Sequence, residues 1–224
     1  MSKKYLLGGV AALLLGAYIF SVLGASLHST GDMGNMVMDD SSAMSASSTG
    51  GDTREDFQTA INIMMEGIMR PATGYPDVDF VKSMIPHHEG AVTMAEIEKQ
   101  SGKDQFLQNI ATNLIQSQGT EVTVLKAWLS RQDLSSMKLI PEAIKANYTF
   151  MMSMMDGMSV SFTGNTDVDF ARTMIPHHQG EIDMARVVLQ FGKDTEIRKL
   201  AQDTISAQET EISSLKEWLA KASN

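Results

Sequence analysis

A stretch of about eighty residues is written twice in this chain, at a constant offset and without an insertion. The pentapeptide Met-Ile-Pro-His-His begins at Met84 and again at Met174. Further matches follow at the same spacing: His87 and His177, Met94 and Met184, Asp104 and Asp194, Gln118 and Gln208, Trp128 and Trp218. The sequence therefore predicts two tandem repeats, at 54–132 and 141–221, and their comparison shows which positions both copies retained.

The sequence pattern of each copy predicts three helices. The first covers about 54–70 and 142–159, where apolar residues recur at helical spacing; Pro71 ends the first of these and Pro141 starts the second. No convincing alternating strand pattern occurs, so we expect an all-α fold.

The second predicted helix opens near Asp77 or Asp79, whose carboxylates suit an N-terminal cap, and ends at Gly102. Asp104 caps the third, which runs to about Leu129. Pro86 falls within the second helix and leaves two alternatives. Either the helix continues with a kink, or its regular part begins only at Ile85 or Pro86.

Histidine and methionine share one face of this second helix. At about 100° per residue, Met84, His87, His88 and Met94 fall within an arc of about 120°. Imidazole nitrogen and thioether sulfur can therefore reach one small volume, with the first helix as a further donor. We predict one principal metal site per repeat, with these ligands: Met84, His87, His88, Met94 and Met65 in the first, and Met174, His177, His178, Met184 and Met155 in the second.

Other retained residues have simpler explanations. Judged alone, Met84 and Met94 are typical core residues, and Asp77 is a helix cap. Gln118 and Gln208 are polar residues on an otherwise amphipathic helix, placed to hydrogen-bond the second nitrogen of a histidine.

Composition narrows the class of metal. The chain has 18 methionines, 5 histidines and no cysteine, a donor set that suits copper or silver better than a hard cation. Its formal net charge is -9, and the absence of basic blocks argues against nucleic-acid binding.

The first 25 residues predict export. Lys3 and Lys4 precede an uncharged run, Tyr5–Gly24, which is long enough to cross a bilayer, so both a cleaved signal peptide and a retained membrane anchor are consistent with it. We expect the rest of the chain to lie outside the cytoplasmic membrane, in the periplasm or its equivalent. Residues 26–53 predict a flexible tether that is either a neutral linker or, through its methionines, a transient site for copper.

One motif occurs twice, and in the first copy it reads Asp79-Phe80, Met84-Ile85-Pro86-His87-His88-Glu89-Gly90 and Met94-Ala95, followed by Gln118, Glu121-Val122 and Trp128-Leu129. This motif resembles that of the domain-of-unknown-function 305 family. The resemblance covers about 54–130 and 144–220. It implies a ferritin-like helical bundle and a role in copper resistance or trafficking, as in tandem, exported, copper-binding members. The histidine pairs and the four helix-face methionines match the family motif. Leu125 and Leu215 stand where many relatives carry methionine, which puts any ligand at that position in doubt.

These observations predict an exported, non-enzymatic protein that sequesters or transfers Cu(I), and that also accepts Cu(II) or Ag(I), in exchange with a protein partner. Two alternatives remain. One is a metal-independent helical module that binds a partner helix through its methionine faces. The other is a di-metal oxidase, which the sequence disfavours because it contains no Glu-x-x-His motif.

Overall fold

The computed structural model describes residues 52–222, which contain six α-helices, one short 3-10 turn and no β-strand. The predicted all-α class is confirmed for this part of the chain. No helix within it is both long and apolar enough to cross a membrane. The predicted export segment, 1–25, and all but the last two residues of the predicted tether, 26–53, lie outside the described residues.

The helices of the two copies follow the same order along the chain. The first copy contains α2 (Arg54–Ile68), α3 (Pro76–Ser101) and α4 (Gln105–Ser130). After the 3-10 turn η1 (Leu134–Ser136), the second contains α5 (Pro141–Gly157), α6 (Thr166–Phe191) and α7 (Thr195–Ala222). These bounds lie close to the predicted ones.

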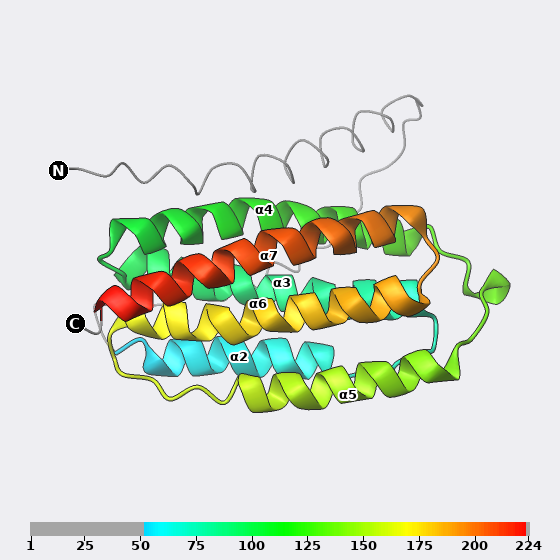
Figure 1. The fold of residues 1–224 in the computed structure, drawn as a ribbon, viewed down its shortest axis with the longest axis horizontal. Helices are drawn as coiled ribbons and strands as arrows, with labels where there is room; N and C mark the ends of the chain where they lie inside the picture. The colour runs from blue at the N-terminus through cyan, green and yellow to red at the C-terminus, as the bar shows by residue number, and fades with distance from the viewer. Residues whose placement is uncertain (1–51, 223–224) are drawn as a thin grey trace, which may run out of the picture.

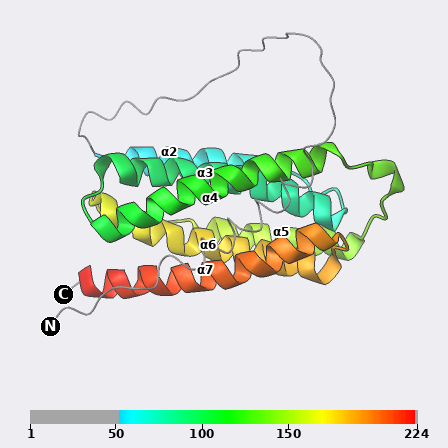
Figure 2. The same cartoon turned by 90° about the horizontal axis from the view of Figure 1, so that it is seen from above.

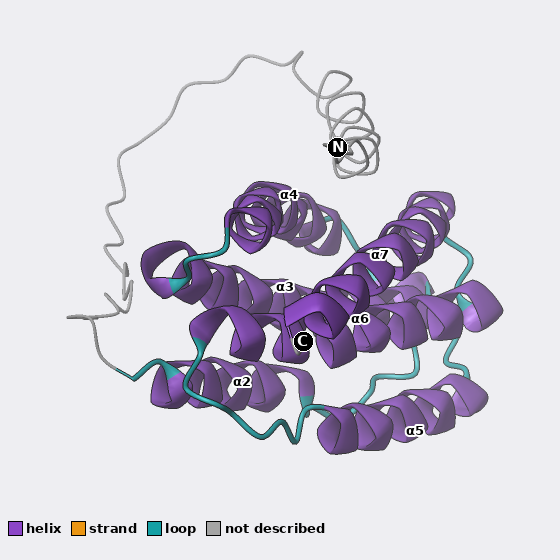
Figure 3. Ribbon diagram, turned by 60° about the vertical axis from the view of Figure 1, so that its left-hand side comes forward, coloured by secondary structure: helices purple, strands orange, loops and turns teal. Residues whose placement is uncertain are grey.

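The six helices lie in three layers of two (Figures 1 and 3). Helices α3 and α6 form the middle layer, α2 and α5 cover it on one side, and α4 and α7 cover it on the other. Seen from above, the helices of the first copy lie on one side and those of the second copy on the other (Figure 2). The two middle helices pack against each other and bury both His-His pairs.

Both middle helices continue through their internal proline. Pro86 lies inside α3 and Pro176 inside α6, so the alternative start at Ile85 or Pro86 is wrong. Each proline lacks an amide hydrogen and leaves one carbonyl of the preceding turn without its helical donor. On α2, Gly67 lies against the Pro86 ring: a Cβ at Gly67 would be 2.5 Å from the Cβ of Pro86.

The aspartates near the start of α3 cap other segments and not α3 itself, which corrects the predicted helix cap. Asp79 accepts hydrogen bonds from the backbone N–H groups of Thr73 and Gly74 (2.7 and 2.9 Å), within the loop before the helix. Asp77 reaches across to the second copy and accepts from the amides of Lys193 and Asp194 (2.9 and 3.2 Å). The Asp79 arrangement recurs in the second copy, where Asp169 accepts from Thr163 and Gly164, whereas the Asp77 contact has no signature in local sequence spacing.

The second copy makes the equivalent contact with the first. Asp167 accepts hydrogen bonds from the amides of Lys103 and Asp104 in the first copy, at 2.9 and 2.8 Å. Helix α3 therefore starts beside the turn that precedes α7, and α6 starts beside the turn that precedes α4. The middle helices are thus antiparallel and related by an approximate two-fold axis, which fixes how their histidines meet.

Candidate metal site at the centre of the bundle

The histidines of the two copies meet in one cluster where α3 and α6 pack together. The rings of His87 and His177 have their centroids 3.7 Å apart and are inclined by 37°. Both side chains are fully buried, so neither ring is hydrated. The sequence suggested a separate group of ligands in each repeat, whereas the structure places an equivalent histidine from each copy face to face.

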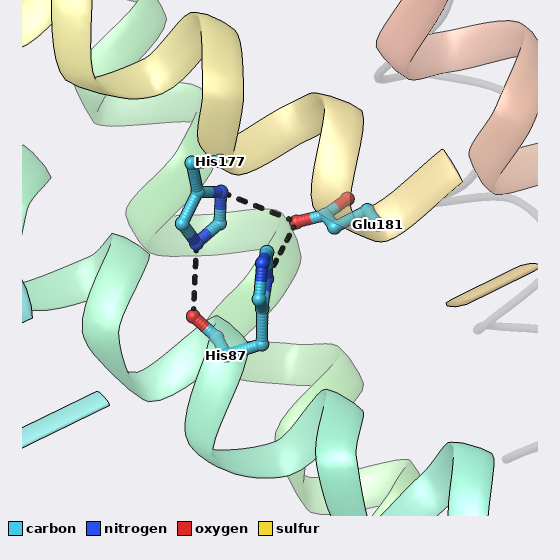
Figure 4. A group of neighbouring side chains, drawn as sticks. All are labelled: His87, His177 and Glu181. Atoms are coloured by element: carbon cyan, nitrogen blue, oxygen red, sulfur yellow. Dashed lines mark hydrogen bonds and ion pairs between the residues drawn. The ribbon is translucent and has the colours of Figure 1, made fainter. Parts of the chain in front are cut away.

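A carboxylate completes the centre of this cluster. Glu181 lies four residues after His177 on α6 and is completely buried. Its Oε1 atom is 3.5 Å from Nδ1 of His87 and 3.7 Å from Nδ1 of His177 (Figure 4). The donor atoms of these three side chains all lie within 4.8 Å of one another, which is compact enough to surround a single metal ion.

The hydrogen bond of His177 defines its tautomer. Its Nε2 atom is 3.1 Å from the backbone carbonyl oxygen of His87, and a carbonyl can only accept, so Nε2 carries the proton (Figure 4). Burial and the nearby His87 hold the pKa of His177 well below its usual value, which leaves Nδ1 unprotonated. The lone pair of Nδ1 and the Glu181 carboxylate therefore face the same small volume, an arrangement that a cation would stabilise.

His87 has the same character. Burial lowers its pKa, and the neighbouring Glu181 offsets this only in part. Its Nδ1 atom is directed towards Glu181, while its Nε2 atom has no hydrogen-bond partner among the described residues. A neutral imidazole is the form that binds metal ions, so both central histidines are ready to act as ligands.

Two glutamines hold the central carboxylate in place. Gln118 donates from Nε2 to Oε1 of Glu181 at 2.8 Å, and Gln208 donates to Oε2. The predicted contact between these glutamines and histidine is therefore wrong, because they orient the carboxylate. Burial alone would raise the pKa of Glu181, but its contacts with His87 and His88 outweigh that effect and hold the pKa well below the usual value.

The second histidine of each pair faces an outer glutamate. His88 Nε2 is 3.0 Å from Glu121, and His178 Nε2 is 3.2 Å from Glu211. Burial works to lower the pKa of His88, but contacts with Glu121 and Glu181 prevail and raise it to about 10. The pKa of His178 is raised by Glu211 in the same way. Both shifts favour the protonated form of the outer histidines, in the opposite sense to the shifts of the central two.

The predicted methionine ligands fall into two groups. The four on the histidine helices are buried, with at most 2% of their surface exposed: Met84, Met94, Met174 and Met184. Met65 on α2 is only half-buried, and Met155 on α5 is 42% exposed. Met155 therefore cannot serve the buried cluster. The inward-facing residues are Met64, the neighbour of Met65, and Met154, the neighbour of Met155, because consecutive helical residues point about 100° apart.

Glycine makes room for these inward methionines, three residues after the first histidine of each pair. A Cβ at Gly90 would lie 2.9 Å from the sulfur of Met64. A Cβ at Gly180 would collide with the terminal methyl of Met154 and lie 3.2 Å from Nε2 of His87. The terminal methyl of Met154 and Nε2 of His87 therefore both border the space that Gly180 leaves open, which makes the Met154 thioether the candidate soft ligand from α5.

The sequence analysis missed three acidic members of the cluster. Glu121 and Glu211 could have been recognised as candidate site residues, because they match in both copies and lie one helical turn after the retained glutamines. Glu181 could not have been recognised in this way, because its counterpart in the first copy is Ala91. A search for positions that both repeats retain passes over this residue, although it lies at the centre.

Known proteins resemble this chain in fold and in part of its sequence. The structure of CopM in the Ag-bound form is 28% identical, covers 68% of this chain and 98% of that chain, and has a TM-score of 0.51. The Cu(I)-bound form of CopM is 29% identical, with coverages of 66% and 98% and a TM-score of 0.50. The Cu(II)-bound form is 30% identical, with coverages of 65% and 97% and a TM-score of 0.50. A comparison with curated protein sequences finds no match.

The family model described as "Domain of unknown function (DUF305)" matches residues 77–219, a single range that runs from the start of α3 to the end of α7. It includes both His-His pairs, the central carboxylate and the glutamines that hold it. The match extends over more than half of the chain, and the chain therefore belongs to the DUF305 family.

Proposed function

We propose that this protein is an exported copper-binding protein that sequesters or hands over Cu(I), accepts Cu(II) and Ag(I) as well, and contributes to copper resistance or homeostasis. The observation that carries the proposal is the uncharged Nδ1 atom of His177, which faces the buried carboxylate of Glu181 at 3.7 Å. Two buried groups with lone pairs directed at one small volume are best explained as ligands of a cation.

The donor set supports copper among the cations. Imidazole suits copper, and thioether ligands select Cu(I) over hard ions. Two neutral imidazoles and a carboxylate form the centre, while Met154 and His87 both border the space at Gly180. CopM, to which this chain is similar, has been solved with Cu(I), Cu(II) and Ag.

Binding is favoured over oxidase chemistry because of how the carboxylates are used. Di-iron bundles direct several glutamates and Glu-x-x-His motifs at two metal ions. Here a single glutamate lies between the central histidines, and Glu121 and Glu211 face the outer ones. The proposal is therefore a binding protein without a reaction of its own, which exchanges copper with a protein partner outside the cytoplasmic membrane.

The test is anaerobic Cu(I) binding to the full chain, measured by competition with a coloured chelator. The double variant His87→Gln/His177→Gln should lose the tightest site, since a glutamine amide is a poor copper ligand. Gln179→Ala, an exposed neighbour on α6, is the matched control and should bind like the wild type. Wild-type affinity in the double variant would refute the central site, and an interaction module that does not need metal would then be the better explanation.

A second pair of variants tests the thioether. Met154→Leu keeps the apolar volume and removes the sulfur, while Met155→Leu makes the same change on the exposed side of α5. We expect Met154→Leu to weaken Cu(I) binding about tenfold and Met155→Leu to leave it unchanged. Equal affinities for the two variants would mean that the Met154 thioether is not a ligand.

A further inference from the structure

The two copies differ at one position of the central cluster. Every other member has its counterpart ninety residues away: His87 and His177, His88 and His178, Gln118 and Gln208, Glu121 and Glu211. Position 181 is glutamate, whereas the equivalent position 91 is alanine, and both side chains are fully buried. Two buried, structurally equivalent positions thus hold one carboxylate between them.

The single carboxylate serves both copies almost equally. Its Oε1 atom lies at similar distances from Nδ1 of His87 in the first copy and of His177 in the second, 3.5 and 3.7 Å. Gln118 of the first copy donates to one of its oxygens, and Gln208 of the second donates to the other. Symmetry-related partners on both sides place this carboxylate close to the approximate two-fold axis, where one such group is sufficient.

One pair of equivalent atoms shows where the two-fold-related carboxylate would lie. Nδ1 of His88 lies 3.5 Å from Glu181, within ion-pair distance. Its counterpart, Nδ1 of His178, is also buried, and neither of these two atoms has a hydrogen-bond partner among the described residues. A glutamate at position 91 would follow His87 by four residues, as Glu181 follows His177, and the two-fold relation would direct it at His178.

We propose that each chain holds one metal ion on the approximate two-fold axis, that Glu181 is the shared carboxylate ligand for both copies, and that position 91 can supply this carboxylate in its place. The inference rests on the proposed function and adds the number of ions and the residue that sets it. It replaces the expectation of one principal site in each repeat.

The experiment moves the carboxylate from one copy to the other. Bound Cu(I) per full-length chain and its affinity are measured without oxygen for the wild type, Glu181→Ala, Glu181→Gln and the double variant Ala91→Glu/Glu181→Ala. Glu181→Ala and Glu181→Gln should each lose one bound ion per chain, or bind it at least about tenfold more weakly. The double variant should recover that ion with an affinity within about threefold of the wild type.

The unfolding midpoint of each metal-free variant supplies a readout that does not depend on copper. Glu181→Ala leaves the amides of Gln118 and Gln208 without their acceptor and should lower the midpoint, and the double variant should restore it in part. Glu181→Gln preserves the side-chain shape and provides a folded protein if Glu181→Ala unfolds.

The outcomes separate the two proposals. If the wild type binds no Cu(I), the proposed function fails. If the wild type binds and the double variant is folded but binds no better than Glu181→Ala, position 91 cannot replace position 181 and this inference is overturned. Loss of two ions per chain on replacing Glu181 would also contradict it, because one shared carboxylate would then control two sites.

Discussion

Glu98 is a buried carboxylic acid at the end of α3 and lies outside the metal cluster. It is completely buried, and neither of its side-chain oxygens has a hydrogen-bond partner among the described residues. Burial raises its pKa to about 8, and the negative charges of Asp167 and Asp104 add to the effect. Its counterpart in the second copy is Val188, so the other end of the molecule lacks an acid at this position.

The raised pKa predicts that the contribution of Glu98 to stability falls as pH rises. Below about pH 4.5 the side chain is protonated in both the folded and the unfolded chain. Between pH 4.5 and about 8 only the folded protein retains the proton, so the contribution of Glu98 to the free energy of unfolding falls across this window, by an amount on the order of a few kcal/mol. Thermal unfolding of the metal-free protein at intervals between pH 4.5 and 8.5 measures this slope.

Two variants isolate the contribution of Glu98. Glu98→Gln resembles the protonated acid, and Glu98→Val reproduces the second copy; both should flatten the pH dependence and be more stable than the wild type near pH 8.5. Glu89→Gln changes an exposed acid on the same helix and should retain the wild-type slope. An unchanged slope in Glu98→Gln would show that another group takes up the proton.

Individual residues also show where prediction from sequence reached its limit. The four central and outer histidines could be identified because the repeat preserves them. Met64 and Met65 could not be ranked from periodicity alone, because either one can be placed on a broad apolar face; the buried stripe of α2 is centred on Met64. Glu181 could not be found by matching the copies, since a carboxylate shared across a two-fold axis is needed only once.

At the scale of elements, the contact between α2 and the proline of α3 is tighter than its counterpart between α5 and α6. A Cβ at Gly67 would lie 2.5 Å from the Cβ of Pro86, whereas a Cβ at Gly157 would be 3.6 Å from that of Pro176. The first distance is a collision with a rigid ring, and the second is an ordinary van der Waals contact.

We therefore expect opposite effects from the same substitution in the two copies. Gly67→Ala should lower the free energy of unfolding by about 1–3 kcal/mol, because either the helix or the proline must move. Gly157→Ala should be neutral or stabilise by up to about 1 kcal/mol, because alanine favours the helix more than glycine does. Urea denaturation of both variants at one pH provides the comparison, and an equal loss of stability would show that the two contacts are alike.

Helix positions followed closely from the sequence because their signals are local. Pro141 is the first residue of α5, and Asp104 caps α4 through the amides of Phe106 and Leu107, as predicted. The partners of Asp77 were not predictable in this way, because its acceptor role depends on a turn more than a hundred residues away. Local spacing defines elements, whereas contacts between the copies depend on how those elements pack.

At the scale of the whole molecule, two aspartates join the copies at opposite ends of the middle layer. Asp77 lies at the start of α3, and Asp167 binds the amides that follow its end. The helix between these points has 26 residues and is therefore about 39 Å long. Contacts this far apart should contribute independently to stability, so the effects of removing each one should add.

The Asp77 and Asp167 contacts should nevertheless respond differently to pH, because only Asp167 lies beside Glu98. Asp77→Asn and Asp167→Asn each weaken two hydrogen bonds from backbone amides and should each cost about 1–2 kcal/mol at pH 5. Asp167→Asn also removes the negative charge that helps to raise the pKa of Glu98, so its stability should fall less between pH 5 and pH 8.5 than that of the wild type.

Asp77→Asn provides the matched control, because Val188 has no proton to exchange and the wild-type pH slope should persist in this variant. The measurement is the free energy of unfolding in urea at pH 5 and pH 8.5 for the wild type and both variants. Parallel slopes in all three would show that Asp167 does not act on Glu98. A smaller slope in Asp167→Asn alone would establish that, of the two equivalent aspartate contacts between the copies, only the Asp167 contact depends on pH, and that Glu98 of the first copy is the cause.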